Sequence, residues 1–359
     1  MTPGDVLGGR YELESRLGKG GMGEVWRARS VETGERVAVK VLLDDVAADK
    51  TLYKRFLREA RAASAVKHPN VVELREVQEG EGGAPFLVME LLRGETLGRR
   101  LKREGALPAA ETAAILLPVF DAVEAAHAAG IVHRDLKPEN IFLARDGGDG
   151  GERVRVCVLD FGIAKRVEKL AAPVAAGAAE TTAAAETTGA MLGTPYYMAP
   201  EQALGERDID GRADVWALGV ILYECLSGRR PTEAPTLGAI LKIIVTDGVP
   251  PLGDVVTDVD PELAEAVTRM LRTSRAERAP TLDGVRAALA RQRSSGVVLD
   301  LSIAEDEEVP ASTASSTTGP TPRRSRRSWR STLAAGGAAA LALATLAFVG
   351  RSFDTSPAP

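Results

Sequence analysis

The spacing of apolar residues changes once along this chain, and that change constrains the fold more than any other feature. Residues 11 to about 80 alternate apolar and polar side chains in short runs broken by glycine-rich turns, which predicts an antiparallel sheet. Only the stretch from Thr51 to Val66 repeats apolar residues every three or four positions there, as a helix does. From Leu107 onward the pattern is mainly helical. A sheet-rich segment before a helix-rich body predicts an α+β fold with two lobes.

Length and composition allow this architecture and exclude some functions. The chain has 359 residues with 45% apolar content, enough to bury a core. Its formal net charge is -5, so no overall basic field points to nucleic acid as a partner. Cys157 and Cys225 are the two cysteines, too few for a disulfide framework, and we interpret both as buried apolar fillers. The first ten residues lack the pattern of a secretory signal.

The composition changes again near the C-terminus. Residues 291–330 are rich in Ser, Thr, Pro and acidic residues and then in arginine, which predicts a disordered linker. Residues 331–350 carry no charge, and twenty helical residues reach about 30 Å, the thickness of a bilayer's hydrocarbon core. The segment therefore predicts a transmembrane helix. Because alanine and glycine dominate it, a disordered tail that never inserts is the alternative.

Charges on either side of this segment predict its orientation. Five arginines precede it, whereas Arg351 and Asp354 are the charged residues of the tail 351–359. The positive-inside bias then keeps the large N-terminal part in the cytoplasm and the tail outside it. Trp329 lies where an interfacial aromatic anchor is expected.

A glycine-rich motif lies within the strand-rich part. Residues 17–25 read LGKGGMGEV and place Gly18, Gly20 and Gly23 in a G-x-G-x-x-G-x-V arrangement. Glycines let a hairpin backbone approach phosphate oxygens and present N–H groups to them. A dinucleotide-binding fingerprint has the same spacing but needs a helix directly afterwards. Because the strand-like EVWRARS follows, the hairpin interpretation is favoured.

Lys40 ends the β-branched run VAVK, on the same face as Ala38 and opposite Val37 and Val39. A buried ammonium needs a counter-charge, and Glu59 is the sole carboxylate of the predicted helix from Thr51 to Val66. Glu59 is therefore the predicted partner, although on the helix alone a solvated surface glutamate remains an alternative.

The most informative residues form two motifs, HRDLKPEN at 133–140 and VCVLDFG at 156–162. Asp135, Lys137, Asn140 and Asp160 supply a proton acceptor, a phosphate clamp and oxygen ligands for Mg²⁺. Phosphoryl transfer requires this combination.

With APE at 199–201, these motifs follow one another in the order found in eukaryotic-type protein kinases, and the chain resembles that family over about residues 11–290. YMAPEQ and GGMGEVWRA resemble the membrane-bound serine/threonine kinases of bacteria more than animal kinases. The resemblance implies a bilobal protein kinase fold, with a β-rich small lobe at 11–92 and a mostly helical large lobe at 93–290.

The resemblance also implies a role for each motif residue. Asp135 resembles the catalytic residue that orients the substrate hydroxyl and accepts its proton, and Lys137 the lysine that contacts the γ-phosphate. Asn140 and Asp160 resemble the ligands of Mg²⁺ or Mn²⁺. Lys40 resembles the lysine that binds the α- and β-phosphates of ATP and is held by Glu59.

ATP is expected between the lobes. Met89 matches the residue behind the adenine pocket, and backbone groups of Glu90 and Leu92 match those that bond the adenine edge. The residues that the resemblance assigns to ATP are Leu17, Gly18, Lys19, Gly20, Gly21, Met22, Gly23, Glu24, Val25, Ala38, Lys40, Glu59, Met89, Glu90 and Leu92.

Further positions match structural or regulatory residues of the family. Asp214 resembles a brace for the catalytic loop, and Arg278 an ion-pair partner for Glu201. Thr194 resembles a threonine that bridges Asp135 and Lys137. For His133 a packing role is the preferred interpretation, and His68 and His127 carry no functional hypothesis.

Between DFG and APE the family carries its activation loop, and here that segment contains AAETTAAAETTG at 178–189. Arg134 directly precedes Asp135, and kinases with this arginine commonly order the loop through a phosphate. Thr187 and Thr188 best match the autophosphorylated threonines of related bacterial kinases, and Thr181 and Thr182 come second. Neutral alanine- and threonine-rich padding is the alternative.

The resemblance therefore implies a non-specific serine/threonine protein kinase that transfers the γ-phosphoryl group of ATP to protein Ser/Thr hydroxyls. Its expected partners are protein substrates, a transient homodimer for autophosphorylation in trans, and the bilayer of the bacterial inner membrane through 331–350. The alternative is an inactive, nucleotide-binding scaffold. The presence of Lys40, Asp135 and Asp160 disfavours it.

Overall fold

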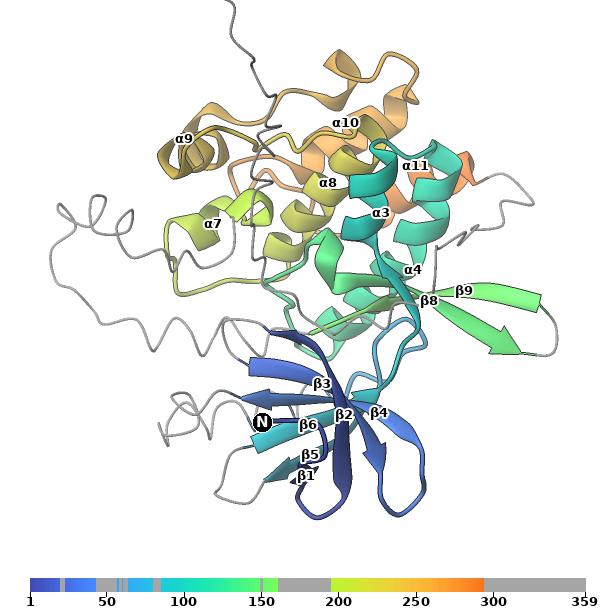
Figure 1. Cartoon of the computed structure of the whole chain (residues 1–359). Helices are drawn as coiled ribbons and strands as arrows, with labels where there is room; N and C mark the ends of the chain where they lie inside the picture. The colour runs from blue at the N-terminus through green and yellow to red at the C-terminus, as the bar shows by residue number, and fades with distance from the viewer. Residues whose placement is uncertain are drawn as a thin grey trace, which may run out of the picture. The chain divides into compact units, whose positions relative to one another are not determined.

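A computed structural model of the chain describes residues 1–19, 23–42, 57, 60, 64–79, 85–148, 151–160 and 195–293 (Figure 1). All of them belong to one compact unit, Met1–Ser316. The described residues form a β-rich small lobe and a large lobe that is mostly helical, as the bilobal kinase fold requires (Figure 1).

The small lobe is one antiparallel sheet with the strand order β1-β2-β3-β4-β6-β5. Its strands are β1 (Val6–Leu7), β2 (Tyr11–Lys19), β3 (Gly23–Ser30), β4 (Arg36–Leu42), β5 (Leu74–Glu79) and β6 (Pro85–Glu90). The predicted sheet is thus confirmed, and β1 extends it to residues before the predicted lobe boundary at 11. Of the predicted helix at 51–66, Leu57 and Ala60 are described as helical and buried, and most of the rest lies outside the described residues.

Alternation along β4 separates a core face from a site face. Val37, Val39 and Val41 pack with Trp26 and Phe86 in one apolar cluster. Ala38 and Lys40 point to the opposite face because successive side chains of a strand alternate. The alternation predicted from VAVK is therefore present.

A second sheet lies within the large lobe and joins it to the small one. Its strands, in the order β7-β8-β9, are β7 (Gly94–Thr96), β8 (Ile141–Gly148) and β9 (Gly151–Val158). The mainly helical pattern after Leu107 did not predict the β8–β9 hairpin, which ends at Val158, two residues before Asp160. A parallel bridge between Val71 and Val158 ties β9 to the segment that leads into β5.

Helices make up the remainder of the large lobe. They are α3 (Leu97–Glu104), α4 (Ala109–Ala128), α7 (Pro200–Ala203), α8 (Arg212–Ser227), α9 (Leu237–Lys242), α10 (Pro261–Met270) and α11 (Asp283–Gln292), with the short turns η1 (Pro138–Asn140), η2 (Pro195–Tyr197), η3 (Ile243–Asp247) and η4 (Leu252–Asp254). Side-chain caps mark three helix starts: Thr96 accepts the N–H of Arg99, Thr236 that of Ala239 and Asp260 that of Leu263.

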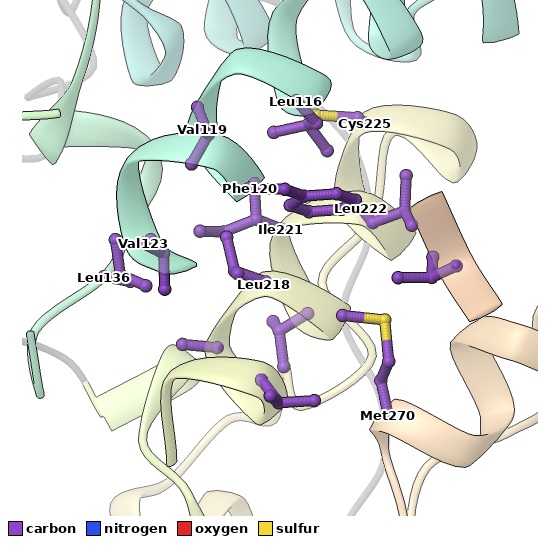
Figure 2. Close-up of a cluster of buried hydrophobic side chains, with 14 of the residues drawn as sticks. Leu116, Val119, Phe120, Val123, Leu136, Leu218, Ile221, Leu222, Cys225 and Met270 are labelled. Atoms are coloured by element: carbon purple, nitrogen blue, oxygen red, sulfur yellow. The ribbon is translucent and has the colours of Figure 1, made fainter. Parts of the chain in front are cut away.

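Helix α8 is the centre of the large lobe and is buried along almost its whole length. Figure 2 shows Leu116 and Phe120 of α4 on one side of it and Met270 of α10 on another. A helix that is apolar on nearly all sides is expected inside a lobe. The first turn of α8 supports the loop that contains His133 and Asp135, because Asp214 in that turn accepts the backbone N–H of His133.

No helix among the described residues is long and apolar enough to cross a membrane. The linker was predicted at 291–330, but Arg291 and Gln292 complete α11, so the helical lobe extends past its predicted end at 290. The predicted linker from residue 294 onward and the predicted span at 331–350 lie outside the described residues.

Candidate active site

One buried carboxylate holds the loop that carries Asp135. Asp214, in the first turn of α8, accepts the backbone N–H groups of His133 and Arg134, both at 2.8 Å. Arg134 has a φ of 64°, a conformation that costs a non-glycine residue energy and persists only where the surroundings impose it. Asp214 therefore fixes the direction in which the chain enters Asp135, which fits the brace implied by the family resemblance.

Two histidines support the same loop. His133 is fully buried, its Nδ1 accepts the N–H of Asp135 at 3.3 Å, and its Nε2 lies 2.9 Å from the carbonyl oxygen of Leu159. The structure thus gives it a packing position between two motifs. His127 was left without a role by the sequence, yet its Nε2 lies 2.8 Å from Asp214 Oδ2. The sequence did contain one indication of this role, because His127 lies near the end of a predicted helix, only six residues before His133.

Asp135, Lys137 and Asn140 form one polar group at the end of this loop. The Lys137 ammonium lies 3.2 Å from the Asp135 carboxylate. Asn140 donates from Nδ2 to the Asp135 backbone oxygen at 2.8 Å and to its Oδ2 at 3.4 Å. The Asp135 carboxylate is a quarter exposed. Lys137 and Asn140 therefore hold it in place while part of it stays open to a substrate.

Lys40 and Asp160 meet across 120 residues of sequence. The Nζ of Lys40, on β4 of the small lobe, donates to Asp160 Oδ1 at 2.9 Å, and the two side chains are 7% and 11% exposed. Asp160 has a φ of 51°, a second costly conformation at this site. Burial strengthens the pair because little solvent screens it.

The residues available for a metal ion fit Mg²⁺. Asn140 Oδ1 and Asp160 Oδ2 are buried, and neither has a hydrogen-bond partner within the described part of the chain. A backbone bond from Leu159 to the Asn140 oxygen, 2.9 Å long, places these two residues side by side. Hard oxygen donors of this kind are the ligands that Mg²⁺ prefers, and buried unsatisfied oxygens are costly without such a ligand.

Apolar side chains from both lobes form a single cluster next to these polar groups. Phe142, the second residue of β8, is a member that the sequence analysis missed, and alternation places it on the same strand face as Ala144. The buried members are Val25, Ala38, Met89, Leu92, Phe142, Ala144, Cys157 and Leu159, with Leu17 packed against them. A flat aromatic base between such walls is the kind of ligand that the cluster suits.

Both cysteines are buried, as predicted. Burial raises the pKa of the Cys157 thiol to about 12 and raises that of Cys225 well above its ordinary value. Both thiols are therefore neutral near pH 7, and Cys157 acts as an apolar wall residue.

The glycine-rich segment is a hairpin, which confirms that interpretation over a dinucleotide fingerprint. β2 pairs with β3 so that Gly18 faces Val25 and Lys19 faces Glu24, whose carboxylate lies 3.3 Å from the Lys19 ammonium. A Cβ at Gly23 would lie 2.2 Å from the oxygen of Val41, so glycine is required there. The predicted phosphate-binding residues Gly20, Gly21 and Met22 lie outside the described residues.

Glu201 and Arg278 form a buried ion pair, as the resemblance implied. Arg278 donates from Nη1 and Nη2 to the two carboxylate oxygens at 2.7 and 2.9 Å. The side chains are 2% and 0% exposed, so the pair belongs to the interior.

Glu59 and the segment 161–194 lie outside the described residues. That segment includes Thr181, Thr182, Thr187, Thr188 and Thr194.

A β-rich small lobe, a helical large lobe and the Lys40, Asp135, Asn140 and Asp160 side chains gathered near their junction define a protein kinase domain. The sequence model of the protein kinase domain matches residues 11–288. The chain belongs to this family.

Its curated relatives include bacterial kinases. It is 38% identical over 303 residues to the serine/threonine-protein kinase PknA of Mycobacterium tuberculosis, covering 82% of this chain and 65% of the relative. It is 41% identical over 281 residues to the serine/threonine-protein kinase Pkn1 of Myxococcus xanthus, covering 78% and 38%. The chain thus spans from about two fifths to two thirds of the length of these relatives.

Solved structures agree with this assignment. The kinase domain of Mycobacterium tuberculosis PknI matches with a TM-score of 0.60 and 27% identity, over 81% of this chain and 99% of that domain.

Proposed function

We propose that this chain is a serine/threonine protein kinase that transfers the γ-phosphoryl group of ATP to hydroxyl groups of protein substrates. The observation that carries the proposal is the meeting of Lys40, Asp135, Asn140 and Asp160 at one site. Relatives named serine/threonine-protein kinases support the reaction and the acceptor class.

The geometry suggests how the chain's own side chains act. Asp135, open on one side, accepts the proton of the attacking Ser or Thr hydroxyl. Its backbone N–H donates to His133 Nδ1 and its carboxylate accepts a bond from Asn140 Nδ2, and both bonds hold it in place. Lys137, 3.2 Å away, neutralises charge on the transferred group. Lys40 binds the phosphates of ATP. Catalysis then consists mainly of positioning and electrostatic stabilisation.

Asn140 and Asp160 would hold Mg²⁺, or Mn²⁺, through their buried oxygens. The ion, when bound, neutralises charge on the phosphate oxygens of the nucleotide. Because Asp160 Oδ1 accepts the bond from Lys40, Oδ2 is the oxygen that Asp160 would offer to the ion.

Two substitutions test the assignment. Asp135→Asn and Lys40→Met are expected to remove nearly all transfer of radiolabelled phosphate from ATP to a generic substrate such as myelin basic protein. Lys242→Met, which removes an exposed lysine paired with Asp247, is the matched control and should leave transfer unchanged. Full activity of either site variant, or wild-type nucleotide binding without transfer, would contradict the proposal.

We also propose that the loop between DFG and APE is autophosphorylated in trans at Thr187 or Thr188, with Thr181 and Thr182 as the second choices. Support comes from Arg134, a cation next to Asp135 that can pair with a phosphate. Mass spectrometry after incubation with ATP and Mg²⁺ should detect phosphate on these threonines. Its absence from all four would reject the switch, and dilution should slow the reaction if a transient homodimer carries it out.

Finally, we propose that residues 331–350 anchor the protein in the bacterial inner membrane with the kinase domain in the cytoplasm. The support is the uncharged length of the segment and the five arginines before it. Fractionation of cells expressing the full chain or a chain ending at residue 330 should place the first with membranes and the second in the soluble fraction. Equal distribution of both chains would reject the anchor.

A further inference from the structure

The β8–β9 hairpin contacts both ends of residues 90–93, the segment that links the two sheets. Arg155 on β9 donates from Nη2 to Glu90 Oε2 at 2.6 Å and from Nη1 to Oε1 at 3.3 Å. At the other end, the backbone N–H of Arg145 on β8 donates to the oxygen of Arg93 at 2.7 Å. In the hairpin register Arg155 faces Ala144, the neighbour of Arg145. Adjacent rungs of one hairpin therefore fix both ends of the link.

Additional bonds fix both partners of the ion pair. Glu90 Oε1 also accepts the backbone N–H of Glu73 at 2.9 Å, and the Glu90 N–H donates to the Glu73 oxygen at 3.1 Å. Arg155 Nη1 also donates to the oxygen of Pro69 at 3.2 Å. The Glu90 carboxylate thus joins β6, the segment before β5 and the hairpin, and it has little freedom to rotate.

The ion pair of Arg155 and Glu90 has the features of a strong one. It is bidentate, both groups are charged, and the side chains of Arg155 and Glu90 are 27% and 16% exposed. The hydrogen bonds with Glu90 raise the pKa of Arg155 above its ordinary value. Such partly buried pairs are screened less than surface pairs.

We propose that Arg155 is a positioning residue that presets the backbone of residues 90–92 for the adenine ring by holding the Glu90 side chain. The inference rests on the proposed function, because the adenine-bonding role of Glu90 and Leu92 belongs to the kinase assignment. A link ordered before binding spares the nucleotide the entropy cost of ordering it. Arg155 lies on a strand outside the kinase motifs, and its bonds go to Glu90 and Pro69, so its effect is expected on affinity rather than on the transfer step.

Arg155→Met in the full chain tests the proposal. The Kd for ATP measured by calorimetry and the KM for ATP in the transfer assay should both rise about threefold to tenfold, while kcat stays within about twofold. Arg155→Lys should recover part of the affinity, because lysine keeps the charge but loses the bidentate geometry. Arg153→Met is the matched control, since Arg153 is exposed on the same strand, and it should bind ATP as the wild type does.

A double-mutant cycle with Glu90→Gln distinguishes positioning from general damage. If the two side chains act as one unit, Arg155→Met combined with Glu90→Gln should weaken ATP binding no more than the worse single variant. Additive losses, an unchanged Kd for Arg155→Met, or a fall in kcat that parallels a lower Tm would overturn the inference. Wild-type ATP binding without transfer would refute the kinase proposal alone, because the Kd comparison would still test Arg155.

Discussion

At the scale of single residues, the largest loss of stability is expected from breaking the buried ion pair of Glu201 and Arg278. Arg278→Met is expected to lower the free energy of unfolding by about 3 to 5 kcal/mol, because it leaves the Glu201 carboxylate buried without a counter-charge. Urea unfolding followed by circular dichroism measures the change. A loss below about 1 kcal/mol would mean that the pair contributes little.

Arg286 offers the matched control for that measurement. It pairs with Asp121 and Glu124 on the surface, where the three side chains are 27%, 49% and 39% exposed. Arg286→Met should therefore cost no more than about 1 kcal/mol. Equal losses for the two arginine variants would show that burial does not decide the outcome.

Cys157 predicts how stability depends on pH. Its thiol keeps its proton in the folded state up to about pH 12, whereas an unfolded thiol loses it near pH 8.5. Between these values the unfolded state binds fewer protons than the folded state, so the free energy of unfolding falls as pH rises. From pH 8.5 to 10 the wild type should lose about 1.5 kcal/mol more than Cys157→Ala.

Urea titrations of both proteins at the two pH values supply this comparison, and Cys225 cancels because both proteins contain it. An identical pH dependence would show that the Cys157 thiolate is tolerated in the fold.

The sequence predicts the role of a residue well when the partners of that residue lie close to it in the chain. Asp135, Lys137 and Asn140 lie within eight consecutive residues, so their proximity follows from the motif. His127 and Arg155 act through partners 87 and 65 residues away in the sequence, and no local pattern marks those partners. Phe142 was missed because the strand that carries it, β8, was not predicted.

At the scale of elements, the contact between α8 and α10 depends on a glycine. A Cβ at Gly219 would lie 2.9 Å from Met270 Cβ and 3.0 Å from Leu271 Cδ2, so the two helices would have to separate. Gly219→Ala should lower the free energy of unfolding by about 1 to 3 kcal/mol through overpacking, although alanine is the better helix former.

Gly238 on α9 is the control for this substitution because a Cβ there would meet no atom within 4 Å. Gly238→Ala should leave stability unchanged or raise it by up to about 1 kcal/mol. Thermal unfolding of both variants measures the contrast, and a Gly219→Ala protein as stable as the Gly238→Ala protein would refute the packing argument.

Periodicity predicted most of the longer elements. The small-lobe sheet and the helices α4, α8, α10 and α11 follow from alternation or from helical spacing. The β8–β9 hairpin escaped prediction because the glycine-rich sequence at 147–151 interrupts two short runs inside a helical region. β1 escaped because two residues are too few to show a period.

At the scale of the whole molecule, the direct contact between Lys40 of the small lobe and Asp160 of the large lobe suggests how nucleotide binding couples to stability. A ligand that binds the folded state alone stabilises it by about 2.7 kcal/mol at a hundred times its Kd. ATP with Mg²⁺ should therefore raise the Tm by an amount on the order of 5 °C for a domain of this size.

The part of this stabilisation that depends on Mg²⁺ tests whether Asn140 Oδ1 and Asp160 Oδ2 are metal ligands. Chelation of Mg²⁺ with EDTA should remove most of the ATP-induced rise in Tm from the wild type, because the nucleotide then lacks the ion that joins it to Asn140 and Asp160. In Asp160→Asn the rise should be small and should not depend on Mg²⁺. Each protein is compared with and without metal, so the loss of the Lys40 bond in the variant cancels. Asp247→Asn, on the surface of η3, should respond as the wild type does. If Asp160→Asn kept the full Mg²⁺-dependent rise, the metal ligands would have to be sought elsewhere in the chain.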